Sequence, residues 1–386
     1  MRLLTPESQR LLATLAPISA KDDVLGAVTK LRKQGLDAEL VAQIVTQLRL
    51  RFRAKAKFGE FASQMLFTEA GLEQSSRLAV AAHHAARFRK HGISSVTDLG
   101  CGIGADSLAF ASIGLSVTAV EQDPETAAIA AYNLAAFENA VVEIADAETF
   151  AATSEGLWFD PARRNLETKT ESRQMVSPAD FSPNLDFVFE TARLKPTGVK
   201  LGPAFPHELI PEDCEAQWVS HQGDLVELTL WFGKLGTKGR SALMLGDTSH
   251  QFSAEQVELA AVDELGTYLY EPDPSLIRSG LMGNLANQLG LWSISAGIAY
   301  LSGSELISNP WLKTYEVLEV LPLDEKRLAA WCREHDIGVV EIKKRGVDIT
   351  PEALRPKLKL KGAGAVTMVL TKVGDARRAL ICRPIR

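Results

Sequence analysis

The sequence predicts an α/β protein: a doubly wound, mostly parallel sheet with an N-terminal helical region and a C-terminal α+β domain. First, apolar residues recur at helical spacing through residues 1–90. Second, short β-branched runs alternate with helical segments from about residue 94, as in repeated βα units. Third, a new set of turns, helices and strands begins after residue 262. We therefore expect three parts, over residues 1–90, 91–248 and 263–386.

The first part is expected to be helical. Leucine, isoleucine and valine recur every three or four residues across 40–48, as on the buried face of an amphipathic helix. Residues 33–37 contain Gly35 and end in Asp37, which indicates that one helix stops and another starts there. His83 and His84 have no partner at metal-binding spacing, so we expect them to be surface or packing residues.

The second part is expected to hold the main sheet, because its strands are apolar throughout, as in a sheet covered on both faces. Three further strands are expected after it, the last two paired as an antiparallel hairpin around the glycine-rich residues 233–239. Residues 247–262 are expected to be a connector. The five parallel strands are predicted at 95–99, 115–120, 141–144, 157–159 and 198–201, and the later three at 217–221, 225–232 and 241–245.

The third part mixes turns, one helix and strands. Pro272-Asp273-Pro274 and Asn309-Pro310 are turn signals. A helix is expected over 276–289, and the strands are expected over 315–321, 338–342 and 366–370. This pattern predicts an α+β domain separate from the βα core.

Composition places the chain among ordinary globular proteins, with 46% hydrophobic and 23% charged residues in a length of 386. No apolar run is long enough to span a membrane, and the N-terminus lacks the apolar core of a secretion signal. The four cysteines are scattered, without a C-x-x-C pair. We therefore expect a cytoplasmic protein with neither a disulfide framework nor a metal site.

Charge is distributed unevenly along the chain, whose net charge is −6. Residues 1–60 carry 11 Lys and Arg against 6 Asp and Glu, and residues 341–386 carry 12 against 4. Basic ends on an acidic body suggest a polyanionic partner. The alternative is that these are ordinary solvated side chains.

A glycine loop follows the first predicted strand, in the sequence Val96-Thr97-Asp98-Leu99-Gly100-Cys101-Gly102-Ile103-Gly104. Glycine allows a ligand to lie directly against the backbone, and the helix that follows directs its N-terminal N–H groups toward that ligand. Gly100, Gly102 and Ala105 fit the dinucleotide pattern G-x-G-x-x-G/A. The alternative pattern, D-x-G-x-G-x-G, begins at Asp98. We favour the second, because a carboxylate there suits a cationic ammonium and would repel a pyrophosphate.

The D-x-G-x-G-x-G pattern resembles motif I of class I S-adenosylmethionine-dependent methyltransferases, which have a Rossmann-like sheet. The resemblance implies that Asp98, Gly100, Cys101, Gly102 and Gly104 hold the cofactor. It places Glu121, with Gln122 beside it, at the ribose hydroxyls, and Asp146, with Ala147 beside it, at the adenine amine. Asp146 could instead cap a helix. Thr68 in Phe67-Thr68-Glu69 resembles a cofactor-covering segment of the trimethylguanosine synthase branch.

Asp160 and Pro161 end the fourth strand, where the transferred methyl group should emerge. Asp160-Pro161-Ala162-Arg163-Arg164 resembles the (D/N)PP(Y/F/W) motif of enzymes that methylate exocyclic amino nitrogens, with alanine and arginine in place of the second proline and the aromatic residue. The resemblance implies that Asp160 positions the acceptor nitrogen. Arg163 and Arg164 could stack on a base, bind phosphate or be plain surface charges.

The C-terminal stretch around Lys343, Lys344 and Arg345, followed by Lys357, Lys359 and Lys361, resembles the THUMP-like domain of bacterial methyltransferases, whose relatives bind RNA. Together the resemblances cover residues 60–386. The implied function is S-adenosylmethionine-dependent methylation of an amino nitrogen of a base in RNA. Two alternatives stay open: a small-molecule or protein methyltransferase with a dimerising tail, and an RNA-binding protein that retains the cofactor site without turnover. The oligomeric state is not predicted.

Overall fold

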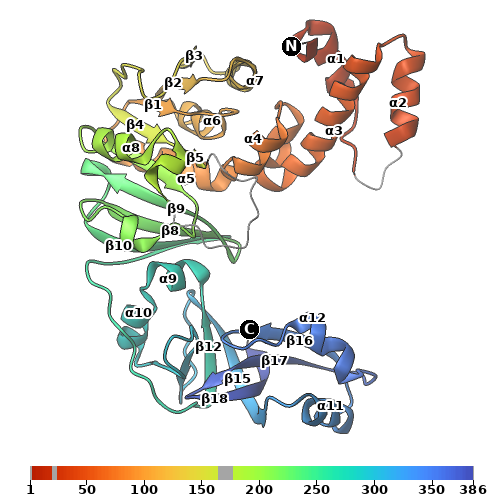
Figure 1. Cartoon of the computed structure of the whole chain (residues 1–386), viewed down its shortest axis with the longest axis vertical. Helices are drawn as coiled ribbons and strands as arrows, with labels where there is room; N and C mark the ends of the chain where they lie inside the picture. The colour runs from red at the N-terminus through yellow and green to blue at the C-terminus, as the bar shows by residue number, and fades with distance from the viewer. Residues whose placement is uncertain (1, 20–23, 164–176, 386) are drawn as a thin grey trace. The chain divides into compact units, whose positions relative to one another are not determined.

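The computed structural model describes residues 2–19, 24–163 and 177–385 (Figure 1). The chain divides into two compact units, the first formed by Met1–Glu215 with Leu228–Thr237 and the second by Ala216–Glu227 with Lys238–Arg386. The division crosses the main sheet, so the boundaries 91–248 and 263–386 stay predictions. No helix among the described residues is long and apolar enough to cross a membrane.

The N-terminal region is helical, as the apolar spacing predicts. Gly35 has φ +87° and Asp37 caps the next helix by accepting the N–H of Leu40, so the predicted stop and restart is confirmed. The helices are α1 (Pro6–Thr14), α2 (Val24–Lys33), α3 (Ala38–Phe58), α4 (Glu69–Gln74) and α5 (Leu78–Lys90), with short 3-10 turns at Arg2–Leu4 and Gly59–Ser63.

Buried polar side chains of α3 hold the segment that leads to α4. Gln47 exchanges two hydrogen bonds with the backbone of Phe67, at 2.7 and 3.0 Å. The Arg51 guanidinium donates to the carbonyls of Met65 and Leu12. These bonds satisfy backbone groups that burial would otherwise leave unpaired. They also fix the position of Thr68, which caps α4.

The main sheet has nine strands in the order β11-β10-β8-β9-β7-β4-β1-β2-β3. Strands β1, β2, β3, β4 and β7 pair in parallel, and β9 runs antiparallel to β7. The predicted doubly wound, mostly parallel sheet is therefore confirmed. The parallel strands are β1 (Ser95–Leu99), β2 (Ser116–Glu121), β3 (Ala140–Ile144), β4 (Gly156–Phe159) and β7 (Thr197–Leu201), and the later ones are β8 (Glu215–His221), β9 (Asp224–Phe232), β10 (Gly239–Leu245) and β11 (Ser249–Ala254).

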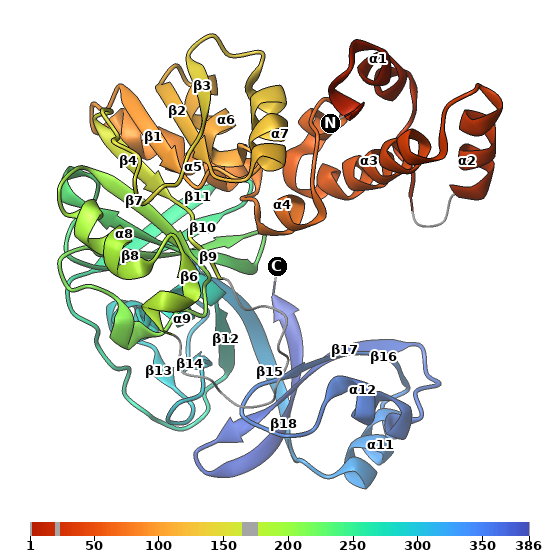
Figure 2. The same cartoon turned by 45° about the horizontal axis from the view of Figure 1, so that its top comes forward.

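Helices cover both faces of the parallel strands (Figures 1 and 2). Trp158 of β4 packs against Phe88 of α5 and Phe110 of α6 (Ala105–Ser112). The next residue, Phe159, points to the other face and contacts Phe187 of α8 (Leu185–Ala192). Helix α7 (Pro124–Leu134) joins β2 to β3 beside α6. Successive side chains of a strand alternate between faces, so β4 is buried by helices on both sides.

Two expectations for the end of this sheet are wrong. The hairpin is formed by β8 and β9, because Gln222 and Gly223, with φ +51° and +85°, make a tight turn between them. Strand β10 therefore lies next to β8 and not next to β9. The predicted connector also contains a strand, β11, which pairs antiparallel with β10.

The second unit contains a seven-stranded sheet in the order β13-β14-β12-β15-β18-β17-β16. All three predicted strands are present, as parts of β15, β16 and β17. The predicted helix over 276–289 is instead two helices, because Gly280 adopts φ +81° and ends the first of them. The strands are β12 (Tyr268–Pro272), β13 (Trp292–Ser293), β14 (Leu301–Gly303), β15 (Leu312–Pro322), β16 (Ile337–Lys344), β17 (Gly364–Val373) and β18 (Ala376–Ile385), and the helices are α9 (Pro274–Ser279), α10 (Met282–Leu289), α11 (Glu325–Glu334) and α12 (Pro351–Leu354).

Candidate active site

The glycine loop joins β1 to α6 at the carboxyl edge of the parallel strands. Gly100, Gly102 and Gly104 have φ of +94°, +55° and +81°, values that L side chains rarely adopt. The N–H groups of Gly100 and Cys101 both donate to the Val120 carbonyl, which anchors the loop to β2. A Cβ added to Gly102 would meet no protein atom within 4 Å. The loop is therefore open to a ligand on the side of Gly102.

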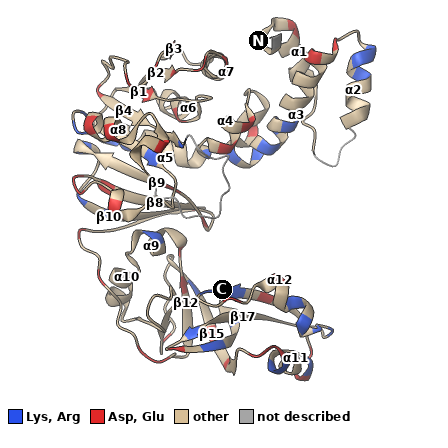
Figure 3. Cartoon of the chain, viewed as in Figure 1, with Lys and Arg blue, Asp and Glu red and all other residues tan. Residues whose placement is uncertain are grey.

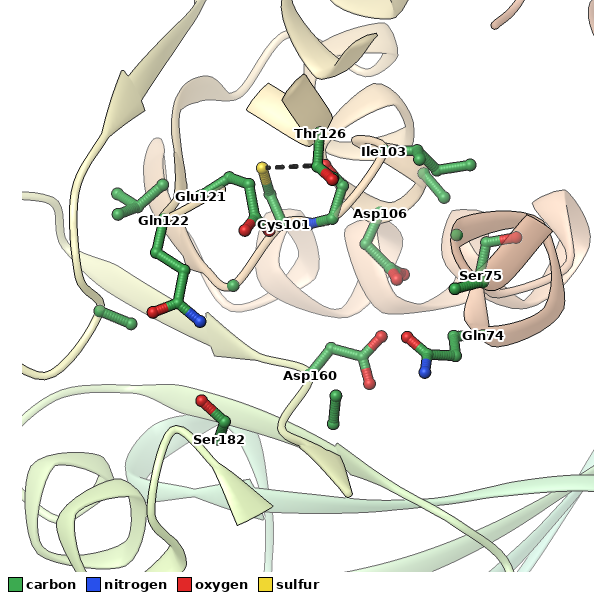
Figure 4. A pocket seen from close by; sticks show the side chains of 18 of the residues that line it. Gln74, Ser75, Cys101, Ile103, Asp106, Glu121, Gln122, Thr126, Asp160 and Ser182 are labelled. Atoms are coloured by element: carbon green, nitrogen blue, oxygen red, sulfur yellow. Dashed lines mark hydrogen bonds between the residues drawn. The ribbon is translucent and has the colours of Figure 1, made fainter. Parts of the chain in front are cut away.

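A cavity of about 270 Å³ lies at this edge (Figure 4). It collects side chains from several strand ends and from α4, which is the usual ligand position in an open α/β sheet. Nine predicted residues line it: Thr68, Gly100, Cys101, Gly102, Glu121, Gln122, Asp146, Ala147 and Asp160. Arg163 does not line the cavity, although its neighbour Ala162 does. Gln74, Ser75, Asp106 and Ser182 also line it.

Glu121 ends β2 and supports the loop. Its Oε2 accepts the Gly102 N–H at 3.1 Å, and its Oε1 accepts the Asp123 N–H at 2.9 Å. A carboxylate has about four lone-pair positions, so these two bonds leave acceptor capacity for two hydroxyl groups. Glu121 can therefore hold the loop and a ribose at the same time.

Thr68 and Asp146 each cap a local turn at the cavity wall. Thr68 Oγ1 accepts the Gly71 N–H at 2.9 Å, and a side chain at Gly71 would clash with Thr68 and Ile103. Asp146 Oδ1 accepts the Glu148 N–H at 2.9 Å. The capping role and the cofactor role predicted for Asp146 are compatible, since its side chain also lines the cavity.

Three of the residues predicted to bind the cofactor or to act in catalysis lie outside the cavity wall. Asp98 is only 1% exposed, and its Oδ2 accepts the Ser107 hydroxyl of α6 at 2.6 Å. Burial, with the nearby charges of Asp106 and Asp160, raises the pKa of Asp98 to about 8. Gly104 packs against α7, and Pro161 is buried at the end of β4.

Asp106, which the sequence analysis did not select, faces the cavity instead. It is the second residue of α6, and its two carboxylate oxygens accept hydrogen bonds from His84 at 2.8 Å and Ser76 at 2.9 Å. Burial alone would raise the pKa of Asp106, but hydrogen bonding and charge from His84 lower it overall. His84 is fully buried and lies against the Trp158 ring, with centroids 4.4 Å apart.

Asp160 is paired with a lysine at the end of β4. Lys200 of β7 donates to Asp160 Oδ2 at 2.5 Å and to the Gln74 carbonyl at 3.1 Å. The Lys200 side chain is 11% exposed and that of Asp160 is 30% exposed, so the pair is largely shielded from water. Lys57 of α3 lies nearby, and burial lowers its pKa to about 8 with help from the charges of Lys200 and Arg77. This end of the cavity is thus a cluster of charged side chains.

The predicted cationic contacts are dispersed. Arg163 is exposed and lies 4.0 Å from Asp180, while Arg164 falls outside the described residues. Lys343 pairs with Glu271 at 2.7 Å, and the Arg345 guanidinium lies over the Tyr300 ring and 3.8 Å from Glu271. Lys344 alone of the three predicted tail cations is exposed. Two of those charges are therefore balanced within the second unit.

Sequence signals existed for one of the missed residues. Lys200 is a lysine inside an otherwise apolar strand, a position that requires a partner. His84 and Asp106 are separated by 22 residues, and only the packing of α5 on α6 brings them together. Nothing in the local pattern around either residue predicts that contact.

The polar groups of the cavity suit S-adenosylmethionine. A ligand can lie against the backbone of the open glycine loop, and Glu121 can accept hydrogen bonds from ribose hydroxyls. The wall is rich in carboxylates, which favour a cationic ligand. Burial raises the pKa of the Cys101 thiol well above its usual range, which argues against a nucleophilic role.

The described residues contain no group of His, Cys, Asp and Glu side chains able to hold a metal ion.

Comparisons with known proteins agree with this geometry. A family profile described as THUMP domain-like matches residues 312–384, and a domain of unknown function, DUF8688, matches residues 1–54. A crystal structure of a methyltransferase-type protein from Porphyromonas gingivalis superposes with a TM-score of 0.76 at 21% identity, covering 98% of this chain and 97% of that one. This likeness shows the shared fold.

Two relatives are close enough to show the family. Uncharacterised S-adenosylmethionine-dependent methyltransferases from two strains of Mycobacterium tuberculosis are each 32% identical to this chain over 352 residues. The match covers 87% of this chain and 95% of each relative. The chain therefore belongs to the S-adenosylmethionine-dependent methyltransferases and carries a THUMP-like domain toward its C-terminal end.

Proposed function

We propose that this methyltransferase acts on an exocyclic amino nitrogen of a base in RNA. The observation that carries the proposal is the position of Asp160, which ends β4 and lines the same cavity as the glycine loop. A carboxylate there can accept a hydrogen bond from an acceptor N–H and direct the nitrogen lone pair toward the methyl group. Such positioning alone can account for about two orders of magnitude in rate.

The chemistry of the wall favours an acceptor that arrives uncharged. When bound, S-adenosylmethionine supplies an electrophilic methyl group, and its sulfur keeps the electron pair of the broken C–S bond. Among the described residues, the side chains that line the cavity include no histidine, lysine or tyrosine that could deprotonate an alkylammonium. Lys200 holds Asp160 in an ion pair, so Asp160 serves as a hydrogen-bond acceptor. An aromatic amine of a base needs no prior deprotonation and loses its extra proton to water after transfer.

Positive and aromatic side chains exposed on α3 and on the turn after it support RNA as the carrier of that base. Arg49, Arg53 and Lys55 are exposed on α3, where Lys and Arg gather (Figure 3). Phe52 and Phe61 are 46% and 51% exposed beside them. Phosphates suit the cations, and bases stack on exposed aromatic rings. The THUMP-like domain adds a second region that we expect to contact RNA.

Transfer of a labelled methyl group to RNA tests the proposal. Total RNA from a strain lacking the gene is incubated with the protein and labelled S-adenosylmethionine, then digested to nucleosides and separated. We expect label in one base carrying an N-methylated exocyclic amine, and none in RNA from the parent strain, which is already modified. Label in ribose, in protein or in a small-molecule fraction would contradict the proposal. RNA binding without any transfer would instead favour a protein that retains the site without turnover.

A further inference from the structure

We propose that Asp106, oriented by His84 and Ser76, is the residue that binds the α-ammonium group of S-adenosylmethionine, in place of Asp98. The proposal concerns a residue in the first turn of α6, outside the glycine motif from which the cofactor contacts were predicted. It rests on the family assignment and not on the nature of the methyl acceptor.

Position separates the two carboxylates. The Asp106 side chain points into the cavity, toward the space bounded by Asp160, Gln74 and Ser75 (Figure 4). Asp98 is 1% exposed and is no part of the cavity wall. A ligand that fills the cavity can reach Asp106 without any movement of the chain, whereas Asp98 does not face that space.

Preorganisation also favours Asp106. His84 Nδ1 lies 2.8 Å from one of its oxygens, and Ser76 donates to the other at 2.9 Å. His84 is in turn fully buried and packed against the Trp158 ring. Each carboxylate oxygen has about two lone-pair positions, so each keeps capacity toward the cavity. A carboxylate held in this way loses little side-chain freedom when an ammonium binds, which strengthens the contact.

Charge gives a third, independent reason. The pKa of Asp98 is raised to about 8, so near pH 7 that carboxyl is mostly neutral. The pKa of Asp106 is lowered overall, against the effect of its burial, by the hydrogen bond and charge of His84. An ammonium requires an ionised partner for a strong charge-assisted hydrogen bond. Asp106 provides that charge at the cavity wall.

Calorimetry with two ligands tests the proposal without using enzyme turnover. S-adenosylhomocysteine has the α-ammonium, and 5′-methylthioadenosine lacks the whole amino-acid part. Asp106→Asn preserves shape and removes the charge, so we expect S-adenosylhomocysteine to bind about 10- to 150-fold more weakly. Binding of 5′-methylthioadenosine should change by less than about threefold. The matched control is Asp98→Asn, which should leave the affinity for both ligands within about threefold of wild type.

A second ligand comparison separates loss of the ammonium contact from a general loss of cofactor binding. A deaminated analogue of S-adenosylhomocysteine should bind wild type and Asp98→Asn with the same loss relative to the parent ligand. A folded Asp106→Asn variant, verified by thermal melting, should show no such loss. The proposal is overturned if Asp106→Asn weakens both adenosine ligands equally, or if Asp98→Asn abolishes the discrimination between the parent ligand and its deaminated analogue.

Discussion

At the scale of single residues, the methyltransferase site depends on how buried carboxylates are partnered. Asp98, Asp106 and Asp160 are close enough to influence one another, yet each has a different companion: Ser107, His84 or Lys200. Burial and the charge of Asp106 raise the pKa of Asp98, whereas the hydrogen bond and charge of His84 lower that of Asp106 against the effect of its burial. The residue type at a strand end therefore does not by itself determine whether its carboxyl group is ionised.

The neutral state of Asp98 predicts a pH-dependent stability. Its pKa rises from 3.8 when unfolded to about 8 when folded, so the folded state binds the extra proton between those values. The stability contribution is complete below about pH 4 and is lost as pH rises through 8, with a slope of at most about 1.4 kcal/mol per pH unit. Asp98→Asn imitates the neutral form. Its melting temperature should match wild type near pH 4 and exceed it at pH 8; equal differences at both pH values would contradict the assignment.

Glu121 should contribute directly to the affinity for the cofactor. Its carboxylate should accept hydrogen bonds from the ribose while it supports Gly102, so Glu121→Ala should weaken S-adenosylmethionine binding by about 1.5–3 kcal/mol, or roughly 10- to 150-fold. Calorimetry measures this directly, with Glu125→Ala on α7 as the control. NAD should not bind either protein. Unchanged affinity in Glu121→Ala would place the ribose elsewhere.

Glu121 and Asp160 could be predicted from the sequence because both directly follow apolar strands whose carboxyl ends share one edge of the sheet. The role of Asp106 could not, and although Lys200 stands out as a lysine in an apolar strand, its pairing with Asp160 could not either, because these contacts span 22 and 40 residues of chain. Such contacts depend on how helices and strands pack, and the local pattern does not contain that information.

At the scale of elements, the β1–α6 loop combines left-handed glycine conformations with open space beside Gly102, and both are needed for a ligand to lie against its backbone. Gly92, in the turn between α5 and β1, offers a matched control: it has φ +68° and, like Gly102, no atom within 4 Å of an added Cβ. Alanine at either position should cost about 1 kcal/mol of folding stability, since both force a side chain into the left-handed region.

Only the Gly102→Ala substitution should affect the ligand. Its methyl group would occupy the open side of the loop, so S-adenosylmethionine affinity should fall at least about tenfold, while Gly92→Ala binds as wild type. Calorimetry and thermal melting on both variants separate the two effects. Equal cofactor affinity in the two variants would show that the ligand does not approach Gly102.

Element boundaries were predictable where apolar period and caps agree, as at Asp37 of α3 or in β1. They were not predictable where a two-residue turn, and not a longer glycine-rich stretch, forms the hairpin. The two residues Gln222-Gly223 form the hairpin, although residues 233–239 carry more glycine. Likewise Gly280 divides a continuous apolar pattern into α9 and α10, because a left-handed residue ends the hydrogen-bonded helix.

At the scale of the whole molecule, the positive charges of the C-terminal region fall into a paired group and an exposed group. Lys343 and Arg345 contact Glu271, so reversing their charge would break internal ion pairs as well as any contact with RNA. Lys344, Lys359 and Lys361 are exposed in the same region. The sequence count gave the excess of positive charge but could not separate these two groups, since pairing depends on the fold.

Reversal of those three exposed lysines to glutamate should weaken RNA binding. It should also reduce the slope of log affinity against log salt concentration by about 2–3, because fewer counterions are released. S-adenosylmethionine affinity should stay the same, since the cavity belongs to the first unit. Filter binding across a salt series measures the slope, and an unchanged slope would exclude this surface as a contact for RNA.

The most direct test of the proposed chemistry is single-turnover methyl transfer by Asp160→Ala with saturating RNA and labelled S-adenosylmethionine. We expect cofactor affinity within about threefold of wild type and a transfer rate lower by about two orders of magnitude or more, because the acceptor nitrogen is no longer positioned. Asp160→Asn, which keeps an acceptor oxygen, should transfer faster than Asp160→Ala. Transfer by Asp160→Ala at the wild-type rate would show that the acceptor is not an amino nitrogen held by this carboxylate.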